Sequence, residues 1–267
     1  MSQREPAVLS AAELGATFAK PIEPARFLAE VSAPRHKAVV LMPTYNERDN
    51  LLRIASAIIA TADVDLMIID DNSADGTGHI ADELARETVH VSVLHRPKKL
   101  GQGRAYVDGM KRALQLGYDH IITMDADFSH PPEKLPEMLA KAKSHDVVIA
   151  SRNVEGSGSE NRTLMRQLIS KTGGLYARTM LGLDVQDMTS GFKCFHRQVL
   201  EAIDVGSIAS NGYAFHIEVI YRAAAAGYSL VEMPYVFVDR TAGKSKMSSS
   251  IVWEALMLCP KLRFKRD

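Results

Sequence analysis

The amino-acid sequence predicts an α/β fold, with a Rossmann-like and mostly parallel sheet covered by helices on both faces. Short apolar stretches alternate with longer amphipathic stretches from residue 37 to about residue 150. The short stretches are apolar throughout, as strands are when helices cover both faces of a parallel sheet. With 267 residues, the chain is long enough to bury a substantial core.

The expected elements of the first part follow in a regular order. The predicted strands are residues 38–42, 66–69, 89–94, 119–125 and 147–150. The predicted helices are residues 50–60, 78–86 and 101–116, and a fourth helix that begins at Pro131 and Pro132 and ends near Lys143. Aspartate and serine before the second helix are natural N-caps, and proline is favoured at a helix start.

The regular alternation ends after Asn153, and the second part is more varied. Residues 154–159 form a loop, and residues 163–181 an amphipathic helix with basic residues around a broad apolar face. We expect an edge strand at 192–195, a helix at 214–226 and a strand at 228–232. The apolar residues 251–258 precede a basic end at 261–266. Both amphipathic segments suit a membrane interface, although packing onto the domain explains each equally well.

These features divide the chain into three segments. Residues 1–36 form a leader that prolines interrupt, which is expected to be flexible. Residues 37–247 form the main domain, and residues 248–267 a C-terminal amphipathic and basic helix. We find neither a signal peptide nor a transmembrane stretch in the sequence.

Composition narrows the class of partners. The formal net charge is zero, so no overall field favours nucleic acid, and any electrostatic attraction must be local. Cys194 and Cys259 form neither a disulfide framework nor a metal-binding pattern. They indicate a reducing compartment and are expected to be small buried hydrophobes.

Asp125 and Asp127 follow an apolar predicted strand and are separated by one small residue, Ala126. Because side chains alternate along a strand, the two carboxylates point the same way. A hard divalent cation that also binds substrate phosphates is the natural partner of such a repelling pair. The alternative is a pair of solvated aspartates that cap the next helix.

Polar residues also follow three other predicted strands, at 44–47, 70–71 and 151–152. Ligands of parallel sheets bind outside the carboxyl ends of the strands, so these residues are expected to share one rim with the aspartate pair. A nucleotide sugar would suit this rim. Pro43, Tyr45 and Glu47 would line a slot for its base and ribose, and Asp71 would accept hydrogen bonds from either. Alternatively, the negative charge of Glu47 interacts favourably with the positive N-terminal end of the following helix.

The basic residues Arg152, Arg166, Arg240 and Lys246 are more cations than one diphosphate requires. A phosphate monoester acceptor would use the surplus, provided that Arg152 and Arg166 face the rim. Its second pKa is near ~6, so it is largely dianionic at neutral pH and can attack an anomeric carbon without a general base. An alcohol acceptor would instead need a dedicated base, which we cannot assign.

Several short motifs stand in a fixed order along residues 38–250. They are PTYNER at 43–48, DDNSADGT at 70–77, KLG at 99–101, MDAD at 124–127, SR at 151–152, MTSG at 188–191, VEMPY at 231–235 and RTAGKSK at 240–246. Together they resemble the dolichyl-phosphate mannosyltransferases and their bacterial polyprenol-phosphate relatives, within the A-type inverting glycosyltransferases of family 2.

The resemblance implies that residues 37–247 are a glycosyltransferase catalytic domain. It would transfer mannose from GDP-mannose to a polyprenyl (dolichyl-type) phosphate with inversion, with Mg²⁺ or Mn²⁺ bound by Asp125 and Asp127. The catalytic residues implied are Asp127, Arg152 and Arg166, with the two arginines on the lipid phosphate. The substrate-binding residues implied are Pro43, Tyr45, Glu47, Ile69, Asp71, Asp125, Ala126, Asp127, Arg152, Arg240 and Lys246, of which Arg152 binds the lipid phosphate and Arg240 and Lys246 close over the donor.

Two departures from the family pattern stand out. Relatives often carry Gln as a further metal ligand two residues after the second aspartate, where this chain has Ser129. Many relatives continue into transmembrane helices, whereas this chain stops at Asp267. We therefore expect a peripheral protein at the cytoplasmic face of a membrane, held there by an anchoring partner subunit or by its own amphipathic helices.

Three other functions remain open from the sequence. One keeps the chemistry but uses another donor, such as a UDP-sugar. Another is a non-catalytic module that binds a sugar nucleotide or a lipid phosphate, against which the intact acidic pair argues. The third is a glycosyltransferase with an alcohol acceptor.

Overall fold

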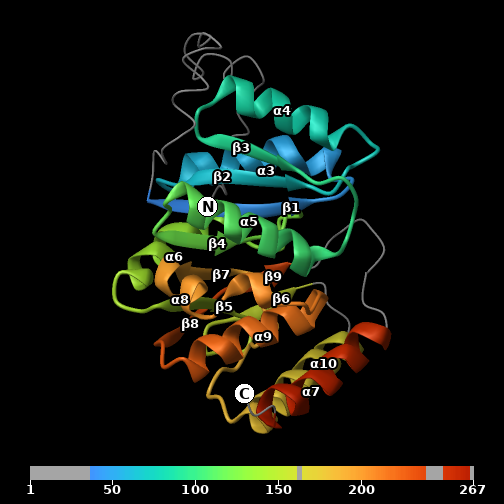
Figure 1. Ribbon diagram of the computed structural model, residues 1–267, viewed down its shortest axis with the longest axis vertical. Coiled ribbons are helices and arrows are strands. Elements are labelled where there is room, and N and C mark those ends of the chain that lie inside the picture. Colours follow the sequence, from blue (N-terminus) through green and yellow to red (C-terminus); the bar gives the residue numbers. More distant parts are fainter. Residues whose placement is uncertain (1–36, 161–163, 239–248, 265–267) are drawn as a thin grey trace, which may run out of the picture.

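The computed structural model describes residues 37–160, 164–238 and 249–264. Its main sheet has seven strands in the order β3-β2-β1-β4-β7-β5-β8 (Figure 1). Their bounds are β1 Ala38–Thr44, β2 Asp65–Asp70, β3 Val91–His95, β4 His120–Thr123, β5 Val147–Ser151, β7 Lys193–His196 and β8 Leu230–Pro234. A separate parallel pair consists of β6 (Gly158–Glu160) and β9 (Val236–Val238).

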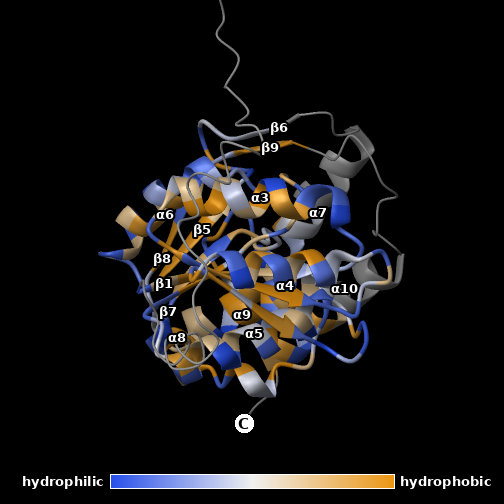
Figure 2. Cartoon of the chain, turned by 90° about the horizontal axis from the view of Figure 1, so that it is seen from above, coloured by the Kyte–Doolittle hydropathy of each residue, from blue (hydrophilic) through white to orange (hydrophobic). Residues whose placement is uncertain are grey.

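Helices cover both faces of this sheet, as the apolar strands predict (Figure 2). One face packs against α3 (Arg48–Thr61), α4 (Thr77–Glu87) and α6 (Leu135–Ala142), which follows the short 3-10 helix η1 (Pro132–Lys134). The other packs against α5 (Gln102–Leu116), α8 (Arg197–Ala202) and α9 (Gly212–Ala225), with the 3-10 helix η2 (Val205–Ser207) before α9. Burial of two apolar layers is the main driving force for this arrangement. The predicted fold class is confirmed.

Strand β7 corrects one expectation. The sequence suggested an edge strand at residues 192–195, but β7 lies inside the sheet, antiparallel to both β4 and β5. Two of its residues, Cys194 and Phe195, are apolar and buried, and its first residue, Lys193, is buried as well. Since β4 and β5 both oppose β7, they run in the same direction, and β7 begins where they end.

The strand order indicates where a ligand would bind on the sheet. β1 pairs in parallel with β2 and with β4, so the order of the strands reverses at β1. Ligands of open α/β sheets bind at such a reversal, outside the carboxyl ends of the strands. The polar residues after β1, β2, β4 and β5 therefore lie along one edge of the sheet, as predicted.

The last helix, α10 (Ser249–Phe264), packs against α9 and against α7 (Leu164–Leu181) (Figure 1). Cys259 of α10 is fully buried in the core, and Leu262 of the same helix packs against this core. Leu175, Met257 and Phe264 are exposed on this pair of helices. None of the helices in the described ranges is both long and apolar enough to span a bilayer.

Candidate active site at the carboxyl edge of the sheet

Asp125 and Asp127 lie just beyond the end of β4, on the rim of the sheet. Oδ1 of Asp125 accepts hydrogen bonds from the Tyr106 hydroxyl, at 3.1 Å, and from the Gln102 amide, both of helix α5. The side chain of Asp125 is 24% exposed, so it is held by the protein and still open to solvent. The chain thus presents this carboxylate at the rim in a fixed orientation.

The turn after Asp125 is tightly constrained. Nδ1 of the buried His130 accepts a hydrogen bond of 2.9 Å from the backbone N–H of Asp125. Because Nδ1 accepts, the ring is neutral with its proton on Nε2, which lies 4.0 Å from Oδ2 of Asp125. Burial lowers the pKa of His130, while the Asp125 and Asp127 carboxylates act in the opposite direction. Phe128 has a φ of 61°, a left-handed conformation that is costly for a residue with a side chain and is often found at functional sites.

Ser129 has a clear structural task at this turn. Its hydroxyl donates a hydrogen bond of 2.6 Å to Oδ1 of Asp127, and its backbone N–H donates another of 3.1 Å to the same oxygen. Ser129 is 2% exposed. Ser129 therefore orients the second carboxylate.

The loops after β1 and β2 are joined by hydrogen bonds. The backbone N–H of Asn46 donates to the Ser73 hydroxyl at 3.0 Å, and the Asn46 amide oxygen accepts from the N–H of Ala74 at 3.1 Å. The N–H of Glu47 donates to the Thr77 hydroxyl at 2.9 Å. These contacts hold the loop that carries Tyr45 and Glu47 against the loop after β2, and the slot between them stays a prediction.

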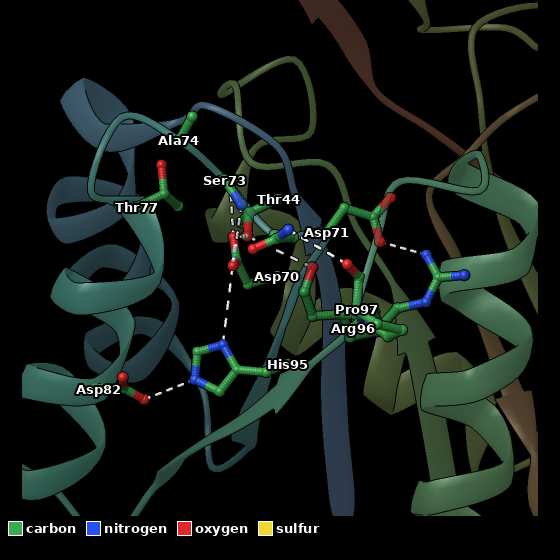
Figure 3. Close-up of polar contacts among 12 residues, drawn as sticks. Thr44, Asp70, Asp71, Ser73, Ala74, Thr77, Asp82, His95, Arg96 and Pro97 are labelled. Atoms are coloured by element: carbon green, nitrogen blue, oxygen red, sulfur yellow. Dashed lines mark hydrogen bonds and ion pairs between the residues drawn. The ribbon is translucent and has the colours of Figure 1, made fainter.

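Asp70 and Asp71, at the end of β2, have different roles (Figure 3). The Ser73 hydroxyl donates to Asp70 at 2.6 Å, so Asp70 shapes the loop. Asp71 forms a buried ion pair with Arg96, whose Nε binds Asp108 at 2.8 Å. Burial raises the pKa of Asp71, and the Arg96 guanidinium opposes this change. Asp71 is thus already paired with a cation beside the expected nucleotide slot.

Lys99 contacts Tyr45, although the sequence singled it out only as part of a motif. Its Nζ lies 3.6 Å from the centroid of the Tyr45 ring, a cation–π contact. Its charge also acts to lower the pKa of Asp71, which places it near that carboxylate. A ligand that stacks on Tyr45 would therefore meet Lys99.

The buried side chain of Ile69 points away from the rim. It packs against helix α5 so closely that a Cβ at Gly109 would collide with its Cδ1. Its carbonyl oxygen accepts a hydrogen bond from the Thr44 hydroxyl at 3.4 Å. Any contact of Ile69 with a nucleotide would therefore use its main chain.

Arg152, one residue beyond β5, is paired with a carboxylate that the sequence analysis did not select. Its Nε and Nη2 donate to Oδ2 and Oδ1 of Asp187, each at 2.7 Å. Both side chains are buried, with exposures of 7% and 1%. The charge of Arg152 is therefore compensated within the protein, which reduces the cation surplus inferred from the sequence.

The side chains of the other three predicted cations lie outside the described part of the structure. Arg166 belongs to helix α7, but its side chain lies outside what is described. Arg240 and Lys246 lie in residues 239–248, also outside the described ranges. Their roles stay predictions.

Two buried basic residues, Lys193 and His216, interact electrostatically inside the domain. Lys193, the first residue of β7, is fully buried and donates through Nζ to the carbonyl of Ser190. Burial lowers the pKa of Lys193 to about 7. Burial also lowers the pKa of His216 well below its ordinary value, with the Lys193 charge acting in the same direction. Lysine and histidine scattered in a sequence give no signal of such a cluster.

A divalent cation fits the aspartate pair chemically. Both carboxylates offer hard oxygen atoms and receive hydrogen bonds from neutral donors, which orient them without neutralising their charge. Among the described residues, no group of three or more His, Cys, Asp or Glu side chains is arranged to hold a metal ion. A cation on Asp125 and Asp127 would therefore complete its coordination with oxygens of substrate or water.

Comparison with known proteins identifies the family. Residues 39–204 match Glycosyl transferase family 2. An undecaprenyl-phosphate mannosyltransferase of Micrococcus luteus is 43% identical over 222 residues, which are 83% of this chain and 91% of that protein. A polyprenol monophosphomannose synthase of Mycolicibacterium smegmatis is 42% identical over 226 residues, which are 84% of this chain and 85% of that protein.

A solved structure extends the comparison to the fold. The mannosyltransferase of Pyrobaculum calidifontis in complex with GDP-Man and Mn²⁺ has a TM-score of 0.52 and 14% identity, covering 90% of this chain and 79% of that one. At this identity the likeness concerns the fold alone. Fold and family match together define a glycosyltransferase. The chain belongs to glycosyl transferase family 2 and, within it, to the polyprenol-phosphate mannosyltransferases, which confirms the resemblance seen in the motifs.

Proposed function

We propose that this enzyme transfers mannose from GDP-mannose to a polyprenyl phosphate, with inversion at the anomeric carbon. The observation that carries the proposal is the position of Asp125 and Asp127 at the end of β4. They lie on the rim between the slot of Tyr45 and Asp71 and the site of Arg152. The two relatives at 42% and 43% identity, named as lipid-phosphate mannosyltransferases, support the acceptor and the sugar. The GDP-Man in the Pyrobaculum calidifontis structure supports the donor.

The nucleotide part of the donor would bind on the β1–β2 side of the rim. The Tyr45 ring offers an apolar face, and Asp71 offers carboxylate oxygens for donors of the base or ribose. Lys99, over Tyr45 and near Asp71, brings a positive charge to the same slot. Glu47, Pro43 and the main chain of Ile69 would complete its walls.

Asp125 and Asp127 would hold a divalent cation, Mg²⁺ or Mn²⁺, on the donor diphosphate. When bound, such a cation offsets the charge that develops on the leaving diphosphate. The Mn²⁺ in the Pyrobaculum calidifontis structure supports this proposal. The protein's own contribution is to fix the two carboxylates, through Tyr106, Gln102 and Ser129.

The acceptor phosphate would bind on the β5 side, near Arg152, with Arg166 as a second contact. An oxygen of the phosphate forms the new bond to the anomeric carbon as the bond to the diphosphate breaks on the opposite face. The acceptor is largely dianionic above pH ~6, so this attack requires no proton transfer. Neither rim aspartate needs to act as a base.

We further propose that helices α7 and α10 rest on the cytoplasmic face of a membrane. Leu175, Met257 and Phe264 expose apolar surface on these helices, and Lys261 and Arg263 in the last turn of α10 add positive charge. Apolar and basic groups together favour binding to an anionic lipid surface. A membrane-anchoring partner subunit would add to this attachment.

The test is a transfer assay with labelled GDP-mannose, a short polyprenyl phosphate and Mg²⁺ or Mn²⁺, followed by lipid extraction. We expect label in the lipid fraction, β-configured mannose by NMR, and loss of transfer with a chelator. Label that enters the lipid only from a UDP-sugar would refute the donor assignment. Nucleotide-sugar binding without any transfer would instead identify a binding module.

A further inference from the structure

We propose that the turn of residues 186–190, held in place by Glu232, is the device that positions Arg152 for the acceptor phosphate. This inference rests on the proposed function, in which Arg152 contacts that phosphate. It assigns positioning roles to Asp187, Thr189 and Glu232, none of which is expected to touch the reacting atoms.

The turn holds Arg152 through four hydrogen bonds, which three nitrogen atoms of the arginine donate. Nε and Nη2 each bind Asp187 at 2.7 Å, and Nη2 also donates to the Thr189 hydroxyl at 2.9 Å. The backbone N–H of Arg152 donates to Oδ2 of Asp187 at 3.0 Å. Two parallel bonds between guanidinium and carboxylate fix the plane of the arginine as well as its position.

The turn is itself fixed from neighbouring strands. The Glu232 carboxylate of β8 accepts hydrogen bonds from the backbone N–H of Gln186, at 2.7 Å, and from that of Asp187, at 2.9 Å. β8 pairs in parallel with β5, the strand that precedes Arg152. At the other end of the turn, Lys193 donates to the carbonyl of Ser190. The Arg152 site is therefore built from β5, β7, β8 and the turn.

The location of this ion pair argues for function rather than stability alone. Buried ion pairs are often no more stabilising than apolar residues of similar size, because both charges must leave water. This pair stands at the rim, one residue beyond β5, beside the ring of Phe237 at 5.5 Å from the guanidinium carbon. Burial acts to raise the pKa of Asp187, but Arg152 outweighs it and holds that pKa at about 2. The carboxylate thus remains charged at every pH at which the enzyme would work.

Kinetics of Asp187→Asn and Glu232→Gln test the proposal with a short polyprenyl phosphate as acceptor. We expect the KM for the acceptor to rise roughly 10- to 100-fold in Asp187→Asn, as misplacement of a binding group does, and less in Glu232→Gln. The KM for the nucleotide sugar should stay nearly constant. Glu201→Gln, which breaks the surface pair of Arg197 and Glu201 at 2.8 Å, is the matched control and should change neither value.

If Asp187→Asn does not fold, the isosteric variant Thr189→Val still tests whether the turn positions Arg152. It removes one acceptor of Arg152 Nη2 and should raise the acceptor KM by a smaller factor. Equal effects on both substrates, or an unchanged acceptor KM in every folded variant, would overturn the proposal. Recovery of the acceptor KM in Asp187→Glu, which restores the carboxylate, would support it.

A second readout does not depend on activity. In the ¹H–¹⁵N spectrum of the whole protein, the Nε–H signal of Arg152, assigned by its loss in Arg152→Lys, should be protected from solvent exchange. It should lose this protection in Asp187→Asn, which alters the acceptor of Nε, and keep it in Thr189→Val and Glu201→Gln, which leave that acceptor in place. An unprotected signal in the wild type would overturn the positioning proposal. A wild type that is inactive with polyprenyl phosphate would instead refute the proposed function, whatever this signal shows.

Discussion

The hydroxyl of Tyr106 donates a hydrogen bond of 3.1 Å to Oδ1 of Asp125 and thereby ties helix α5 to the rim of the sheet. The Tyr106 ring is fully buried and stacks on Phe215 of α9, with 5.8 Å between centroids. Burial, helped by the Asp125 charge, raises the pKa of Tyr106 well above its ordinary value. The hydroxyl is therefore a permanent donor that orients this carboxylate from inside the core.

Replacing Tyr106 by Phe should weaken metal binding while leaving the fold intact. The ring and its stacking would remain, but Asp125 would lose one of the donors that orient it. Residues that orient metal ligands typically contribute 10- to 100-fold in affinity, so we expect about a 10-fold higher Kd for Mn²⁺ in titration calorimetry.

Tyr118→Phe is the matched control for this prediction. Tyr118 is also buried and donates to a carboxylate, Asp65, at 2.9 Å, but Asp65 is the first residue of β2, at the opposite end of that strand from the rim. Both variants should lose some stability, and only Tyr106→Phe should lose metal affinity. Equal Mn²⁺ affinity in the two variants would contradict the orienting role of Tyr106.

Asp127→Asn should abolish transfer with the fold intact. The amide keeps the shape of the side chain but loses the negative charge that a divalent cation requires, so the effect should exceed the roughly 100-fold upper range for indirect contacts. Transfer to lipid and Mn²⁺ affinity measure the loss, and circular dichroism checks the fold. Turnover close to that of the wild type would refute the proposed metal-binding role of Asp127.

Lys193→Met should change how stability depends on pH. The pKa of Lys193 is about 7 in the folded protein, against 10.5 for an ordinary lysine. Between these values the unfolded chain binds a proton that the folded protein does not. The free energy of unfolding therefore gains a contribution that rises with pH across this window.

Chemical denaturation at several pH values measures this effect. The wild type should gain stability relative to Lys193→Met from pH 7 to pH 10.5, by on the order of a few kcal/mol. A constant difference between the two proteins over that range would mean that Lys193 stays protonated in the folded state.

Arg166→Ala should raise the KM for the lipid acceptor more than the KM for the nucleotide sugar. The prediction follows from the expected contact of Arg166 with the acceptor phosphate, since a cation on one substrate affects chiefly that substrate. Steady-state kinetics with each substrate varied in turn provides the measurement. Equal changes in both values would indicate that Arg166 supports the structure of helix α7.

The sequence alone predicted much of the fold because local signals were strong there. The apolar strands ending at Thr44, Asp70 and Ser151 could be recognised without neighbours, as could the amphipathic helices between them. Strand β7 was misplaced at an edge, because pairing with β4 and β5 depends on residues far away in the chain. Short apolar stretches carry no information about which strands lie beside them.

The same division holds for the site. The sequence by itself determined that Asp125 and Asp127 follow a buried strand, because the apolar residues before them form a local pattern. Strand β4 ends at Thr123, so the alternation of side chains along a strand does not extend to the two aspartates, and the prediction that both carboxylates point the same way stays a prediction. Only the tertiary structure decided that Tyr106 orients Asp125 and that Asp187 pairs with Arg152, contacts across 19 and 35 residues of chain. Burial and charge pairing arise from packing between distant segments. No local pattern of residue types encodes them.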